Sequence, residues 1–204
     1  MTPTRTPALL LFSALAALSC GQEDPTGGGP TPPVSGPTAS SAFAVEFIGA
    51  HDQARAGTLT GVVLNPAPSP ALGTLTWSQP AANVAQGWAN GCTWAHNPDR
   101  GADGTARGEN LFASAPAGRT DVDPTFVVTG WGAEYVDYSW DTNTCAAGKV
   151  CGHYTQVVWR TTTKVGCAMA TCSVNSPWGA AFPTWDFFVC DYEPPGNWVG
   201  EKPY

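Results

Sequence analysis

NTCAAGKVCGHYTQVVWRTTTKVGCAMATC, at residues 143–172, is the stretch that decides the fold, and it holds four of the chain's 7 cysteines. Inside it, HYTQVVW (153–159) alternates in a way that is typical of a strand, because side chains of a strand point to opposite faces in turn. KVGCAMATC (164–172) and WDFFVCDY (185–192) are two further predicted strands. Their short connections favour an antiparallel sheet.

The half of the chain that precedes this stretch has helical periodicity. Helices are predicted over residues 42–57, 78–92 and 124–138. Gly57 is a plausible stop for the first helix, Ser78 a cap for the second, and Asp121 or Asp123 a cap for the third. Residues 58–76 are rich in Pro and Gly and read as a loop. Helices first and strands later indicate an α+β fold in which helices cover the sheet.

Composition excludes several classes of function. A length of 204 residues is consistent with one domain plus tails. Charged residues make up 12% and the formal net charge is −7, which argues against nucleic acid and against docking on anionic lipid through a basic patch. No apolar run approaches the ~20 residues that a membrane-spanning helix needs.

The first residues read as an export signal. Residues 1–19 carry one cation, an apolar run and a small residue, as in a short signal peptide. Cys20 follows at the position where bacterial lipoproteins are lipidated, although ordinary secretion with a chance cysteine is the alternative. The remainder of residues 20–41 is a Gly- and Pro-rich tether. The globular domain is expected over residues 42–204.

The other six cysteines indicate an oxidising compartment. An even number of cysteines in an exported chain predicts three disulfides. A zinc–thiolate cluster is the alternative, and it fits poorly because no C-x-x-C occurs. Six cysteines allow 15 pairings, and their spacing does not choose among them.

Histidines are rare, and two of them are candidates for chemistry. If the fold brought His96, His153, Glu109 and Glu134 together, the imidazoles could ligate a divalent ion such as zinc while the carboxylates orient them. The same group could perform acid–base work on water. Spacing alone does not show this convergence, and it favours four scattered, hydrogen-bonded side chains.

Four blocks in order carry a family resemblance. They are HDQAR (51–55), GEN (108–110), GHYTQVVW (152–159) and CDYEPPGNWVGEKPY (190–204). Together they resemble the CAP superfamily of cysteine-rich secretory proteins, antigen-five allergens and plant class-one pathogenesis-related proteins. The resemblance spans roughly residues 43–204. It implies an α-β-α sandwich with a central antiparallel sheet, stapled by disulfides.

The resemblance also implies a site. Its central cavity would be formed by His96, Glu109, Glu134 and His153, with any divalent metal, most simply zinc, held by His96 and His153. His51 would belong to the first-helix motif, and we interpret it as a hydrogen-bonded residue of the packing. The implied disulfides are Cys92–Cys172, Cys145–Cys151 and Cys167–Cys190. Asp52 and the longer segment 173–189 depart from the family pattern.

Three functions follow as hypotheses. The first is an exported, envelope-tethered, non-enzymatic binding module for a lipid, a sterol or a protein partner. The second is a metal-dependent, peptidase-like hydrolase that uses the same four residues, although no G-x-S-x-G or H-E-x-x-H motif occurs. The third is a purely structural surface domain.

Two aromatic segments are candidate contact surfaces. The stripe on the third predicted helix could line an apolar slot, but such a stripe more often belongs to the core; it comprises Trp131, Tyr135, Tyr138 and Trp140. The insertion around Trp178 and Phe182 is either a contact loop or a loop folded back over the sheet.

Overall fold

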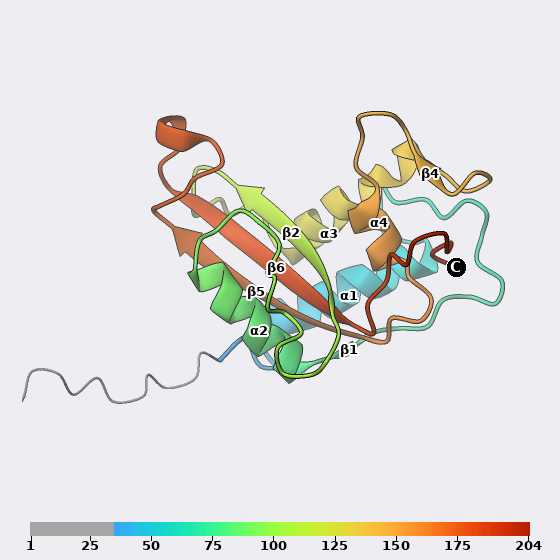
Figure 1. Cartoon of the computed structure of the whole chain (residues 1–204), viewed down its shortest axis with the longest axis horizontal. Coiled ribbons are helices and arrows are strands. Elements are labelled where there is room, and N and C mark those ends of the chain that lie inside the picture. Colours follow the sequence, from blue (N-terminus) through green and yellow to red (C-terminus); the bar gives the residue numbers. More distant parts are fainter. Residues whose placement is uncertain (1–34) are drawn as a thin grey trace, which may run out of the picture. The chain divides into compact units, whose positions relative to one another are not determined.

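The computed structural model describes residues 35–204 (Figure 1). The predicted signal peptide, Cys20 and most of the predicted tether lie outside the described residues. At the end of the tether range, Gly36 donates its N–H to Asn83 Oδ1 at 2.8 Å, and Pro37 accepts from Trp77 Nε1 at 3.2 Å. In the described part of the chain, no helix is both long and apolar enough to cross a bilayer.

The three predicted helices form where the sequence places them. They are α1 (Ala42–Ala56), α2 (Gln79–Asn90) and α3 (Pro124–Gly132). Side chains of Ser41, Ser78 and Asp123 accept backbone N–H groups at their first turns, and α1 ends at Gly57 with φ of 70°. The cap of α3 is thus Asp123. The chain then tightens into a 3-10 helix, η1 (Ala133–Asp137), before residue 138.

One four-stranded sheet forms the centre. Its order is β1 (Thr76–Trp77), β5 (Lys164–Cys172), β6 (Trp185–Glu193) and β2 (Gly108–Ser114). The β5–β6 and β6–β2 pairs are antiparallel. The short β1 begins at the last residue of the predicted loop 58–76 and runs parallel to β5. A separate hairpin consists of β3 (Tyr138–Ser139) and β4 (Thr144–Cys145). The strand β2 therefore forms one edge of the sheet.

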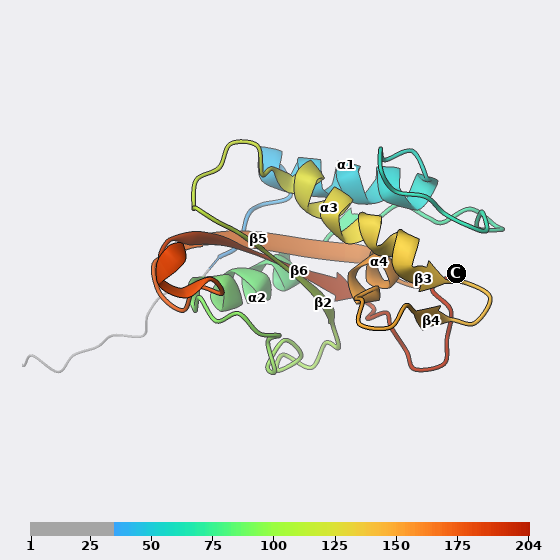
Figure 2. The same cartoon turned by 90° about the horizontal axis from the view of Figure 1, so that it is seen from above.

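Helices cover both faces of this sheet. Figure 2 shows α1 and α3 on one side and α2 on the other, which confirms the α-β-α sandwich. The larger core lies on the α1 and α3 side and includes Phe47, Trp131 and Tyr192. On the other side α2 lies so close that a β-carbon at Gly166 would collide with the backbone of Ser78 and Ala82.

The prediction of a strand at residues 153–159 was wrong. This segment is the short helix α4 (Gly152–Val157). Its first backbone N–H groups have a partner from a distant segment, because Glu134 Oε2 accepts from the N–H of His153 at 3.0 Å and of Tyr154 at 3.2 Å. A carboxylate at a helix start satisfies donors that the helix itself leaves free, so a contact far along the chain favours the helical conformation.

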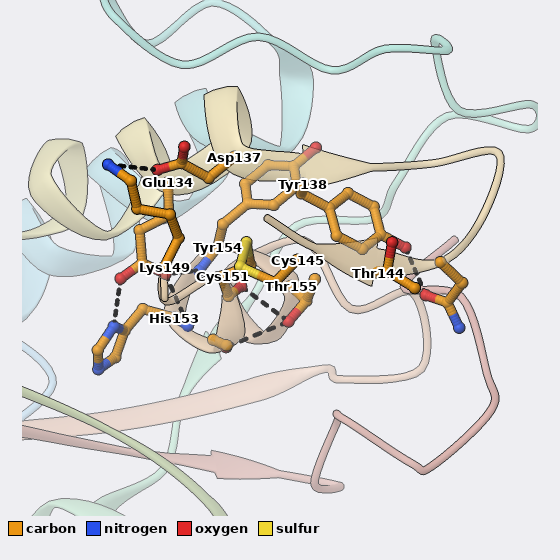
Figure 3. The surroundings of a disulfide bond; sticks show 12 residues. Glu134, Asp137, Tyr138, Thr144, Cys145, Lys149, Cys151, His153, Tyr154 and Thr155 are labelled. Atoms are coloured by element: carbon orange, nitrogen blue, oxygen red, sulfur yellow. Dashed lines mark hydrogen bonds and ion pairs between the residues drawn. A yellow bond between two sulfur atoms is a disulfide. The ribbon is translucent and has the colours of Figure 1, made fainter. Parts of the chain in front are cut away.

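All six cysteines form the pairs that the family resemblance implied. Cys92–Cys172 joins the end of α2 to β5, and Cys167–Cys190 joins β5 to β6. Cys145–Cys151 closes the segment between β4 and α4 (Figure 3). The last of these bridges fixes the chain immediately before His153.

Candidate functional site

His153 and Glu134 form the first imidazole–carboxylate pair. His153 Nδ1 lies 2.6 Å from Glu134 Oε1, and the other carboxylate oxygen holds the start of α4 (Figure 3). The side chains are 26% and 18% exposed. The imidazole also stacks on the Trp131 ring at an interplanar angle of 19°. Glu134 therefore holds the imidazole of His153 at Nδ1, and Trp131 packs against one of its faces.

His96 and Glu109 form the second pair. His96 follows α2, and its Nδ1 lies 2.7 Å from Oε1 of Glu109 on β2. The same oxygen accepts the N–H of Asn97 at 2.9 Å. The Glu109 side chain is 1% exposed, whereas the imidazole of His96 is 60% exposed. This pair thus joins a buried acid to an open imidazole.

The two pairs share one chemical arrangement. Each imidazole uses Nδ1 on a glutamate, so a neutral ring with its proton on Nδ1 carries its lone pair on Nε2. A carboxylate behind the imidazole is the common way to orient a metal-binding histidine and raise its basicity. Each of the two imidazoles therefore offers a nitrogen donor of the kind that a divalent ion such as zinc binds.

The four predicted site residues contact one another as two separate pairs, His96 with Glu109 and His153 with Glu134. Among residues 35–204 the hydrogen bonds of these side chains stay within each pair and its adjoining backbone. In the same range no group of three or more His, Cys, Asp or Glu side chains is placed to hold a metal. The convergence of all four in one cavity stays a prediction.

Asp191 is a feature that the sequence analysis missed. It pairs with Glu109 across β6 and β2, is 0% exposed, and neither carboxylate oxygen has a hydrogen-bond partner. Glu109 Oε2 is likewise buried and unpartnered. Burial, and then the charge of Glu109, raise the pKa of Asp191 well above its usual value. The available signal was the presence of two acids, Asp186 and Asp191, in the otherwise apolar run WDFFVCDY.

His51 is a packing residue, as predicted. Its Nδ1 lies 2.7 Å from the Phe47 carbonyl and its Nε2 lies 2.9 Å from the Tyr192 hydroxyl. That hydroxyl also accepts from Asn110 Nδ2 at 3.2 Å. Complete burial lowers the pKa of His51 to about 4, so the ring is neutral at neutral pH.

Two hollows bear on the aromatic candidates. One, of about 440 Å³, is lined by both members of the first pair, by part of β2, and by Trp94 and Trp178. The other, of about 610 Å³, is lined by Tyr135, Tyr138 and Trp140, while Trp131 of the same stripe is buried in the core. The insertion therefore contributes a wall to the hollow beside His153.

Comparison with known proteins gives the family. A PR-1 type pathogenesis-related protein of Sambucus nigra is 39% identical over 166 residues, covering 78% of this chain and 80% of that protein. Peptidase inhibitor 16 of Mus musculus is 40% identical over 130 residues, 64% of this chain, but the match spans 24% of that longer protein. Venom allergen-like protein 4 of Schistosoma mansoni shares the fold with a TM-score of 0.56 at 22% identity, covering 80% of this chain and 91% of that one.

The family profile agrees with these relatives and with the site. Residues 48–192 match the CAP, or cysteine-rich secretory protein, family, and this range contains both imidazole–carboxylate pairs. The layered fold and the three disulfides fit the same assignment. The chain therefore belongs to the CAP family of cysteine-rich secretory proteins.

Proposed function

We propose that the domain is an exported, non-enzymatic binding module that holds a zinc ion through His96 and His153. The observation that carries this proposal is the common arrangement of the two pairs. In each, a glutamate engages Nδ1 and leaves Nε2 as the nitrogen that can ligate a metal. Bound zinc would supply a positive charge with coordination positions left for water or for a donor atom of a ligand.

The residues behind the imidazoles support binding over hydrolysis. Both oxygens of Glu134 are already engaged, one by His153 Nδ1 and the other by two backbone N–H groups. The free oxygen of Glu109 is buried. A general base must reach the proton that it removes, so both acids are better suited to orient imidazoles than to activate water.

Calorimetric titration of the chelator-treated protein with zinc at neutral pH tests the proposal. We expect one zinc per chain, and we expect His96→Ala and His153→Ala each to lower the affinity by at least about tenfold. Lys149→Ala is the control, because it removes an exposed side chain that pairs with Asp137 and is not a proposed ligand. No zinc binding by the intact domain, or equal affinity in all variants, contradicts the proposal.

The same preparation separates a binding module from a hydrolase. With zinc present, we expect no turnover of a broad peptide mixture. Turnover that requires zinc and disappears in His153→Ala would instead establish the peptidase-like alternative. Binding and catalysis are measured separately, so either answer is informative.

We further propose that the exported chain is tethered to the cell envelope through lipidated Cys20. The support is the signal-like run of residues 1–19 followed directly by this cysteine. Membrane-fractionated protein should carry acyl chains by mass spectrometry, and Cys20→Ser should release it into the medium. Unacylated protein in the medium of the parent strain contradicts this proposal.

A further inference from the structure

The edge strand β2 has an unpaired backbone side. In the sheet order β1-β5-β6-β2, the partner of β2 (Gly108–Ser114) is β6. Among residues 35–204, no backbone–backbone hydrogen bond outside the sheet ladder involves this strand. An edge strand presents a row of N–H and C=O groups that another extended chain can pair with.

One side-chain contact shows which backbone groups point outward. Trp131 Nε1 donates to the Leu111 carbonyl at 3.0 Å, so this carbonyl points away from β6. In an antiparallel ladder, alternate residues turn both backbone groups to the same side. Ala113 therefore presents its N–H and C=O outward beside the N–H of Leu111.

The hollow of about 440 Å³ straddles this edge. Leu111 and Ala113 pack with the core on the α2 side, whereas Phe112 and Trp131 pack with the core on the α1 and α3 side, and all four line the hollow. Walls therefore lie on both sides of the outward backbone groups. A volume between about 300 and 1,000 Å³ with a few polar groups is typical of a ligand site.

The aromatic walls are accessible. Trp94 is 45% exposed and contacts Trp185 and Phe187 edge-on, and Trp178 of the insertion is 43% exposed. The insertion residues 173–184 contain no charged side chain. His153 and Glu134 stand at the same hollow.

We propose that the free edge of β2 binds a short extended peptide as an added strand. The peptide would pair its backbone with Ala113 and with the N–H of Leu111. Its alternate side chains would contact Trp94 and Trp178 on one side and Trp131 and His153 on the other. A hydrocarbon ligand would leave these backbone groups unpaired, so the edge favours a peptide over a lipid.

The chemistry of the peptide follows from its surroundings. Two exposed tryptophans favour apolar or aromatic side chains at alternate positions. A net charge of −7 on the chain favours neutral or basic peptides over acidic ones. Backbone pairing requires no metal, so this inference stands independently of the proposed zinc site.

Selection from a phage-displayed library of random linear peptides tests the proposal on the exported chain. We expect enriched peptides with apolar residues at alternate positions. An N-methyl scan of an enriched synthetic peptide should lower its affinity about tenfold at every second residue and leave the intervening positions nearly unchanged. This alternation arises from strand pairing, and it is measured on the unmodified protein.

Variants of the chain sharpen the test. Ala113→Pro removes one outward N–H and should lower peptide affinity about tenfold, and proline is tolerated on an edge strand where its nitrogen faces away from the ladder. Trp94→Ala and Trp178→Ala should also weaken binding, whereas Trp198→Ala, which removes another exposed tryptophan outside this hollow, should not.

Three outcomes would overturn the inference. The selection enriches no peptide, the N-methyl scan shows losses without alternation, or Trp94→Ala and Trp178→Ala bind the peptide as well as the parent protein does. The selection is run with zinc and with chelator. Peptide binding in both conditions with no zinc uptake contradicts the zinc proposal alone, whereas zinc uptake without peptide binding contradicts the strand proposal alone.

Discussion

The two faces of the β2–β6 pair treat buried polar groups in opposite ways. On the α1 side, Asn110, Tyr192 and His51 form a hydrogen-bonded network in which the imidazole has partners on both nitrogens. On the α2 side, the neighbouring residues Glu109 and Asp191 leave three carboxylate oxygens buried without a partner. One residue step along each strand separates the two arrangements.

The difference locates a cost next to the candidate site. Buried polar groups normally find partners, so an unpartnered pair of acids is destabilising. Glu109 is also the acid that orients His96. The destabilising pair of acids on the α2 side is therefore next to one proposed metal ligand, His96. The hydrogen-bonded network on the α1 side contributes to packing.

Lowering the pH should destabilise the fold through His51, on the α1 side of the sheet. The pKa of His51 is lowered from 6.5 to about 4 by burial, so the unfolded chain takes up its proton first as the pH falls. Its contribution is complete above pH 6.5 and is lost as the pH falls from 6.5 toward about 4. We expect a loss of about 3 kcal/mol in the free energy of unfolding over this window.

Denaturant titrations at several pH values measure this loss. They are best made in an Asp191→Asn background, because the raised pKa of Asp191 contributes with the opposite sign. His51→Gln in that background removes the imidazole, and its stability should vary less over the same window. Equal pH dependence with and without His51 contradicts the assignment.

Replacing the buried acid Asp191 should raise the free energy of unfolding, by less than the acid-induced loss expected from His51. Asp191 has a raised pKa, so its cost grows as the pH rises from about 4 toward neutrality. Asp191→Asn removes this ionisation and offers an N–H to the unpartnered Glu109 Oε2. We expect the free energy of unfolding to rise by about 1–3 kcal/mol at pH 7.

Thermal unfolding at pH 7 and near pH 4 distinguishes the cause. The gain from Asp191→Asn should shrink at the lower pH, where the aspartic acid is already protonated. The parent protein and the Asp191→Asn variant have the same disulfides, so these bridges do not contribute to the difference in stability. A gain that is independent of pH would point to packing in place of charge.

How much of this the sequence reveals differs between local and distant interactions. Ser41, Ser78 and Asp123 cap helices by contacts within three residues, so the helix starts at 42, 79 and 124 follow from local patterns. The predicted strands over residues 164–172 and 185–192 correspond to β5 (Lys164–Cys172) and β6 (Trp185–Glu193). The disulfide pairs came from the family resemblance, since spacing left them open.

Interactions between distant segments account for what the sequence did not reveal. Residues 153–157 alternate like a strand, yet Glu134 holds the backbone of this segment as a helix from far along the chain. Asp191 and Glu109 face each other through a strand register that no local pattern states. Likewise the free edge of β2 emerges from the order of strands in the sheet.

The two glutamates offer the finest test of the comparison between faces. Glu134→Gln and Glu109→Gln should each weaken zinc binding by about tenfold, or ~1.4 kcal/mol, because a neutral amide orients an imidazole less well. Their effects on stability should differ. Glu134→Gln weakens the acceptor at the start of α4 and should destabilise by about 1 kcal/mol.

Glu109→Gln removes a charge that faces Asp191 in a buried site, and its free energy of unfolding should rise or stay level at pH 7. Paired zinc titration and denaturant unfolding of the two variants measure both quantities. Loss of stability in both would mean that the carboxylate of Glu109 is as well satisfied as that of Glu134. A fall in zinc affinity without a fall in stability at Glu109 would show that its charge serves the imidazole at the expense of the fold.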